Sequence, residues 1–74
     1  MRRLDASGLF CPLPVLKARK ALLAMLPGEI LEVVTTDPMS IVDMPLFCAQ
    51  AGHRIVHEDR HDSGFVFTIE KGRE

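Results

Sequence analysis

The sequence predicts a two-layer α/β sandwich, in which a four-stranded mixed sheet carries two helices on one face. Three observations indicate this fold. Segments with strand-like and helix-like apolar spacing follow one another in the order β-α-β-α-β-β, separated by short turn signals. The 74 residues leave room for one domain only, residues 1–74. Two consecutive β-α units favour right-handed crossovers, which place both helices on the same side of the sheet.

The first half of the chain predicts a strand, a helix and a second strand. Residues 2–5 are a short candidate strand at the N-terminus. From Pro12 to Met25, apolar residues recur at helical spacing, and Pro27-Gly28 follows where a helix would end. Residues 30–36 read "ILEVVTT", a run of β-branched residues that is long enough for a strand.

A second helix is expected after this strand. Asp37-Pro38 is a typical helix opening, with a carboxylate cap and a proline at the first helical position. Pro45 interrupts the apolar stripe that follows, and it predicts either a kink or a restart of the helix with Asp43 as a second cap. Gly52 is expected to end the helix.

The last part of the chain predicts a hairpin, with strands at residues 53–60 and 65–71 and a turn at residues 62–64. Three histidines in this segment are spaced by four residues, which on a helix would align metal ligands. On a strand, neighbours in this series lie about 13 Å apart, too far to share one ion. The sequence therefore predicts no metal site at these residues, which are His53, His57 and His61.

Composition and charge exclude several classes of function. The net charge is −1 and the chain has no tyrosine or tryptophan to stack on bases, so we expect no direct contact with nucleic acid. The longest clean apolar run, residues 21–26, is too short to span a bilayer, and polar residues near the N-terminus interrupt any signal-like stretch. We therefore expect no membrane insertion and a cytoplasmic location, where free thiols are the default state.

Cys11 stands out because a proline follows it directly and another lies two positions further on, in "LFCPLP". If Cys11 caps the helix, Pro12 takes the first helical position and the thiol lies at the positive end of the helix. The Leu13 amide would then be the nearest free donor for the sulfur. This placement predicts a thiol pKa below its ordinary value. Pro14 leaves a second start open, because it disfavours helical geometry at the residue before it.

Other interpretations of the polar and sulfur-bearing residues stay open. Cys11 could be a small apolar filler, since free cysteines are often buried and inert, but a filler needs no rigid frame of prolines. Cys48 lies on the apolar stripe of the second helix and is expected in the core. The two cysteines do not form a Cys-x-x-Cys pair, which disfavours a thioredoxin-type dithiol. The basic residues Lys17, Arg19 and Lys20 form a solvated helix face or, alternatively, a docking patch.

Four blocks of sequence, in order along nearly the whole chain, resemble the TusA/SirA-like family of small sulfur-carrier proteins: "LDASGLFCPLPVLKARKAL", "PGE", "TTDP" and "DMPLFCAQAGH". The resemblance implies the same β-α-β-α-β-β sandwich. It also implies that Cys11 carries sulfur as a transient persulfide, received from a cysteine desulfurase and passed to a downstream acceptor, with no other cofactor. Pro12 and Pro14 would frame the motif.

The resemblance implies a sulfur relay rather than a classical turnover enzyme. In the best-known branch the relay ends in tRNA thiolation, whereas other branches serve sulfur oxidation, molybdenum-cofactor or selenium metabolism. This chain departs from the best-known branch by having Phe10 and Leu13 where charged residues occur. With Leu9 and Lys17, these residues are the expected partner-binding surface.

Two other functions compete with the relay. One is a regulatory or protein-binding module in which Cys11 is only a structural helix cap. The other is a redox or metal protein that uses both cysteines or the histidines.

Overall fold

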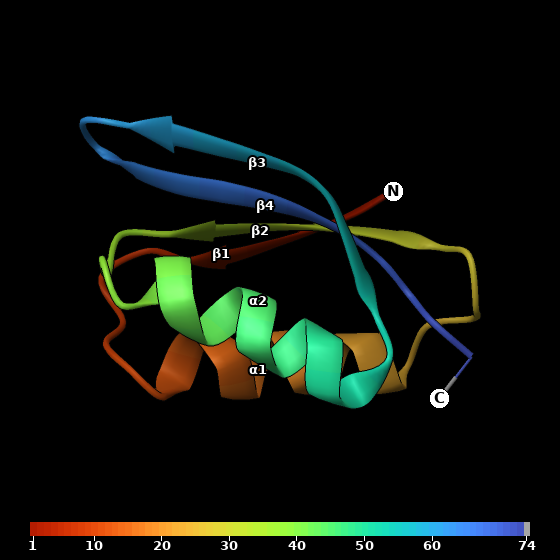
Figure 1. The fold of residues 1–74 in the computed structure, drawn as a ribbon. Coiled ribbons are helices and arrows are strands. Elements are labelled where there is room, and N and C mark those ends of the chain that lie inside the picture. The colour runs from red at the N-terminus through yellow and green to blue at the C-terminus, as the bar shows by residue number, and fades with distance from the viewer. Residues whose placement is uncertain (74) are drawn as a thin grey trace.

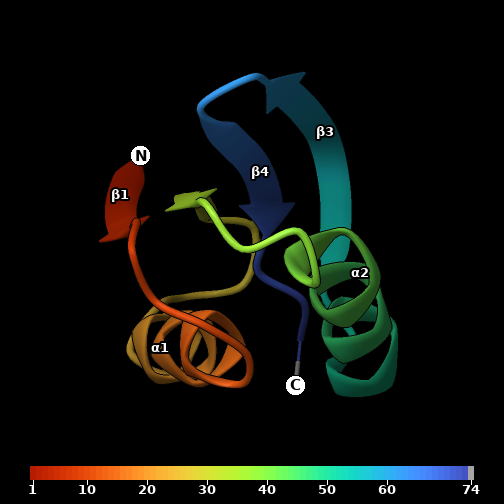
Figure 2. The ribbon, with the colours of Figure 1, turned by 90° about the vertical axis from the view of Figure 1, so that its left-hand side faces the viewer.

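The computed structural model describes residues 1–73 and shows two layers, a four-stranded sheet with both helices packed against one of its faces (Figures 1 and 2). The predicted fold class and element order are confirmed. The elements are β1 (Arg2–Ala6), α1 (Leu13–Leu23), β2 (Ile30–Thr35), α2 (Ser40–Ala51), β3 (Arg54–His61) and β4 (Gly64–Glu70). The predicted domain range ends at Glu74, which lies outside the described residues.

The strands lie in the order β1-β2-β4-β3, so β1 and β3 form the two edges of the sheet. β1 runs parallel to β2, whereas β4 runs antiparallel to both β2 and β3. The β3–β4 turn is tighter than expected, because His61 pairs with Gly64 and only the two residues between them form the loop. A register shift between Ile55 and His57 marks a bulge in β3.

The core lies between the sheet and the helices. β2 and β4 supply its sheet side, and the two helices cover it from below in the view of Figure 1. Cys48 is 2% exposed among these residues, as expected, and burial raises the pKa of its thiol to about 11. The other residues of the core cluster are Ala18, Leu22, Met25, Leu31, Val33, Met44, Phe67 and Ile69.

α2 differs from the expected helix at its start and at Pro45. The helix begins at Ser40 rather than at Pro38. The Asp37 carboxylate does accept a hydrogen bond from the amide of Met39 (3.1 Å), in the turn that directly precedes the helix. The helix continues through Pro45 as one element, so the predicted restart with Asp43 as a second cap is wrong. Its end at Gly52, which has a left-handed backbone (φ 83°), agrees with the sequence.

No helix within residues 1–73 has the length and apolar character needed to cross a membrane.

Candidate functional site

Cys11 lies in the loop between β1 and α1, beside the loop between β2 and α2. The two loops are neighbours because β1 and β2 are adjacent parallel strands, so their carboxyl ends lie side by side at the same end of the sheet. Two hydrogen bonds join the loops directly. The Gly8 amide donates to Thr36 Oγ1 (2.8 Å), and the Cys11 amide donates to Asp37 Oδ2 (2.6 Å). The backbone of Cys11 is therefore held by a residue 26 positions away.

Asp37 is the residue that connects the two loops. Its side chain is almost fully buried, and its two carboxylate oxygens accept the amides of Cys11 and Met39. Hydrogen bonds from an amide to a carboxylate are roughly twice as strong as bonds between neutral groups. One carboxylate thus fixes both the position of Cys11 and the approach to α2. Sequence reasoning gave Asp37 only the role of a helix cap.

The expected helix cap at Cys11 is wrong. α1 begins at Leu13 and its N-cap is Pro12, so the helix starts between the two predicted positions and Cys11 precedes the cap. The Cys11–Pro12 peptide bond is cis. The Leu13 amide donates to the carbonyl of Phe10 (2.9 Å) in a tight turn, so this amide is not free to bind the sulfur.

The expected fall in the pKa of the Cys11 thiol is also wrong in sign. Hydrogen bonding to the Asp43 carboxylate raises this pKa above its ordinary value, with further contributions from desolvation and from the charges of Asp43 and Asp37. A negative neighbour disfavours the thiolate, and α1 starts two residues after Cys11, so the thiol does not occupy the capping position from which a helix dipole acts most strongly. The free chain therefore disfavours the thiolate form of Cys11 relative to an isolated cysteine.

The Cys11 side chain is exposed and lies at a groove of about 260 Å³ between α1 and α2. Asp43, Leu46, Phe47 and Gln50 of α2 form one wall of the groove. Its other wall is formed by Pro12 and Val15 at the start of α1. A partner that enters the groove to reach the thiol would contact both helices.

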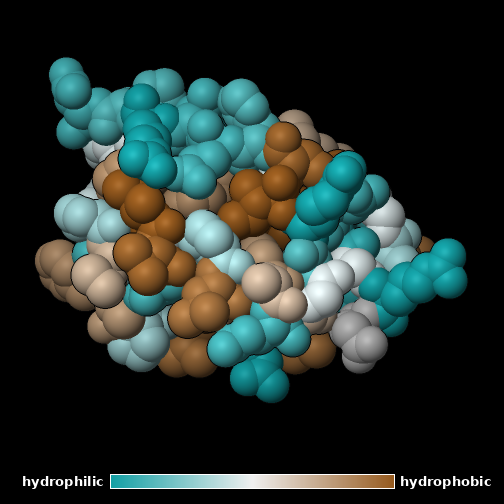
Figure 3. All heavy atoms as spheres, in the orientation of Figure 1, coloured by the Kyte–Doolittle hydropathy of each residue, from teal (hydrophilic) through white to brown (hydrophobic). Residues whose placement is uncertain are grey.

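Several large apolar side chains are exposed on the Cys11 loop and on the helices beside it. Phe10 is 72% exposed and Leu13 is 46% exposed. The structure adds exposed residues from α2 and the turn before it, and Figure 3 shows apolar side chains gathered over this helix. We call this surface the docking patch. It consists of Phe10, Leu13, Met39, Val42 and Leu46.

The remaining predicted site residues lie in different surroundings. Leu9 is half-buried, Pro12 is exposed and Pro14 is buried within the first turn of α1. Lys17 lines a separate depression beside β1, together with Lys20, and does not line the groove at Cys11. Within residues 1–73, no group of three or more histidine, cysteine or acidic side chains is arranged to hold a metal ion.

The family model described as "Sulfurtransferase TusA" matches residues 2–71. The chain belongs to the TusA family. A "Sulfur carrier protein TusA" of Allochromatium vinosum is 44% identical over 70 residues, which cover 95% of this chain and 92% of that protein. A TusA of Pseudomonas syringae pv. tomato is 41% identical, covering 92% of this chain and 81% of that protein.

A solved structure confirms the fold of this TusA-family chain. The crystal structure of a SirA-like protein from Desulfitobacterium hafniense matches with a TM-score of 0.82 and 26% sequence identity, and it covers 99% of this chain and 100% of that chain. The resemblance stated from the sequence blocks is thereby confirmed at the level of the family.

Proposed function

We propose that this TusA-family chain is a sulfur carrier that holds sulfur as a persulfide on Cys11. The observation that carries the proposal is the contrast between its two thiols. Cys11 is exposed on a loop that Asp37 holds in place, whereas Cys48 is buried in the core. A carrier needs one accessible thiol at a defined position, without a second accessible thiol that would trap it as a disulfide.

In the loading step, Cys11 Sγ attacks the outer sulfur of a persulfide on the donor protein. A new S–S bond forms between Cys11 Sγ and that sulfur, the donor's S–S bond breaks, and the donor cysteine leaves as a thiolate. The Cys11 thiol must lose its proton in this step. The Asp43 carboxylate hydrogen-bonds to the thiol and is placed to accept the proton.

In the unloading step, a thiolate of the acceptor attacks the outer sulfur, and Cys11 is the leaving group. A thiol with a raised pKa is the poorer leaving group. The carboxylates that raise the pKa of the Cys11 thiol therefore slow the loss of sulfur to stray thiols. A docked acceptor that screens Asp43 would remove this restraint.

The partners proposed for this relay are a cysteine desulfurase as donor and a protein acceptor downstream, in the reducing cytoplasm. The docking patch supports this proposal, because exposed apolar side chains next to a reactive group are typical of protein contact sites. The relay would feed tRNA thiolation or another sulfur-trafficking pathway. The chain itself would contact proteins rather than nucleic acid.

The test is mass spectrometry after incubation with a cysteine desulfurase and cysteine. We expect the Cys11 peptide to gain the mass of one sulfur atom and to lose it again under reductant. Cys48→Ser is the matched control and should load normally, whereas Cys11→Ser should not load. Loading that survives in Cys11→Ser would refute the proposal.

The docking patch also suits a regulatory module in which Cys11 is only structural. The same variant separates the two functions. If Cys11→Ser keeps partner binding and the cellular phenotype intact, the regulatory module is the better description.

A further inference from the structure

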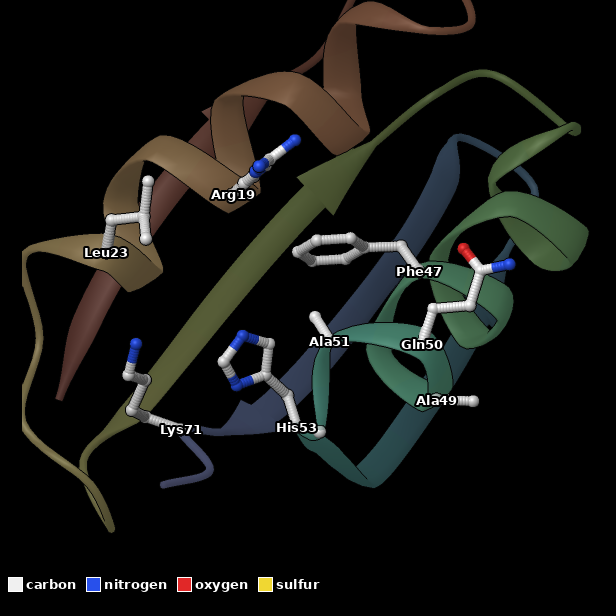
Figure 4. A pocket seen from close by; sticks show the side chains of 9 residues that line it. Arg19, Leu23, Phe47, Ala49, Gln50, Ala51, His53 and Lys71 are labelled. Carbon is white, nitrogen blue, oxygen red and sulfur yellow. The ribbon is translucent and has the colours of Figure 1, made fainter. Parts of the chain in front are cut away.

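A second cavity lies between the helices, at the end away from Cys11 (Figure 4). Its volume is about 430 Å³, and Phe47 and Gln50 line both this cavity and the groove at Cys11. Arg19 and Leu23 enter it from α1, and Lys71 closes it from the end of β4. The proposed function leaves this cavity unused.

Lys71 lines the cavity with a cationic side chain. The residue is 6% exposed, and its backbone is fixed by hydrogen bonds to Glu29 and Gly28 (2.8 Å each). Within residues 1–73, no carboxylate forms an ion pair with Lys71 or with Arg19, the other cation of the cavity. A charge that is largely removed from water is stable only when an opposite charge compensates it. An anion bound in the cavity would supply that compensation.

His53 adds a hydrogen-bond donor of fixed direction. Its Nδ1 accepts the amide of Gly72 (2.9 Å), so the neutral ring carries its proton on Nε2. Burial, and next the charge of Lys71, lower the pKa of His53, which keeps the ring neutral at pH 7. Figure 4 shows the second ring nitrogen turned toward the space between the helices.

The walls of the cavity select among anions. Leu23, Phe47 and Ala51 present apolar surface beside the two cations. An inorganic oxyanion would have to give up water on its apolar sides, whereas a carboxylate on an aliphatic stem satisfies both kinds of wall. We propose that this cavity is a carboxylate site, in which Lys71 and Arg19 supply the charge and His53 Nε2–H a hydrogen bond.

The site is tested by NMR titration of the ¹⁵N-labelled protein with glutarate and, as a neutral analogue, glutaramide at constant pH and ionic strength. We expect saturable shifts at the amides of His53, Lys71 and Gly72 with glutarate only. A charge-assisted hydrogen bond of about 1.5 kcal/mol corresponds to a roughly tenfold change in affinity. Arg19→Gln should therefore lower the affinity for glutarate about tenfold.

Lys20→Gln is the matched control, because it removes the same charge one residue away and Lys20 does not line the cavity. Lys71→Gln should abolish binding. If that variant does not fold, the pair Arg19→Gln and Lys20→Gln decides the question, since both residues are exposed. The proposal would be overturned if glutaramide caused the same amide shifts as glutarate. It would also be overturned if Arg19→Gln and Lys20→Gln lowered the affinity for glutarate equally.

A second experiment separates two sources of the carboxylate, an acidic side chain of a docked partner and a free small molecule. Sulfur loading of Cys11 is measured against donor concentration, with and without saturating glutarate. If glutarate and Arg19→Gln both raise the donor concentration required for half-maximal loading of Cys11, the occupant of the cavity is a side chain of the donor. If neither does and the titration still shows binding, the site takes a free carboxylate. Failure of loading with glutarate binding intact would refute the relay and leave the carboxylate site standing.

Discussion

Asp37→Asn removes the connection that the structure places between the Cys11 loop and the start of α2. Asp37 is 7% exposed, and its two oxygens accept the amides of Cys11 (2.6 Å) and Met39 (3.1 Å). An asparagine has one acceptor oxygen, so one amide would lose its partner and face an NH₂ group. A hydrogen bond to a charged group contributes about 1.5–3 kcal/mol and a neutral one about 0.5–1.5 kcal/mol. Losing one charged bond and weakening the other should lower the free energy of unfolding by about 2–4 kcal/mol.

Urea denaturation followed by circular dichroism measures this loss. A chain of 74 residues has a total stability of about 4–11 kcal/mol, so the shift in midpoint would be large. Asp5→Asn is the matched control, because Asp5 is exposed and its hydrogen bonds come from Ser7, two positions away, through the amide (2.9 Å) and the hydroxyl. A loss below about 1 kcal/mol for Asp37→Asn, or an equal loss for Asp5→Asn, would refute the role given to Asp37.

Two further predictions concern the thiols. Asp43→Asn removes the largest cause of the raised pKa of the Cys11 thiol, so that pKa should fall and the pH profile of iodoacetamide alkylation should move to lower pH; an unchanged profile would contradict this. Cys48 is buried and burial raises its pKa to about 11, so the native protein should react with one equivalent of Ellman's reagent and with a second only in denaturant. Two fast equivalents in the native protein would show that Cys48 is accessible.

The order of the elements could be predicted because each element has a local signal. β-branched residues mark β2, helical spacing marks α1, and Gly52 ends α2 where the sequence places its end. The exact helix starts could not be predicted in this way. At α1 the start depends on the turn from Phe10 to Leu13, and at α2 it depends on a turn that Asp37 stabilises. The hydrogen bonds within both turns are local, but a long-range hydrogen bond from the Cys11 amide to Asp37 joins the two turns.

The candidate site was predicted only in part. The prolines around Cys11 indicate a reactive thiol, but the contact between Cys11 and Asp37 joins residues 26 positions apart and leaves no local pattern. The sign of the pKa shift could not be predicted for the same reason, because the start of α1 is visible in the sequence whereas the proximity of carboxylates from another loop and helix is not. The burial of Lys71 likewise depends on the loop at Gly28 and Glu29, which pairs with it.

The edge strand β3 affects the tendency of this small protein to associate with other copies of itself. An edge strand exposes unpaired backbone groups that invite another sheet to add to it. Here a bulge interrupts the edge strand between Ile55 and His57. The ion pair Arg60–Glu58 (2.9 Å) lies within β3, and the ion pair Arg54–Glu70 (3.2 Å) joins β3 to β4. The upper rim in Figure 3 is accordingly hydrophilic. Both features oppose self-association through the sheet. The docking patch, by contrast, keeps its apolar side chains exposed, so we expect contacts with other proteins to form there rather than along this edge.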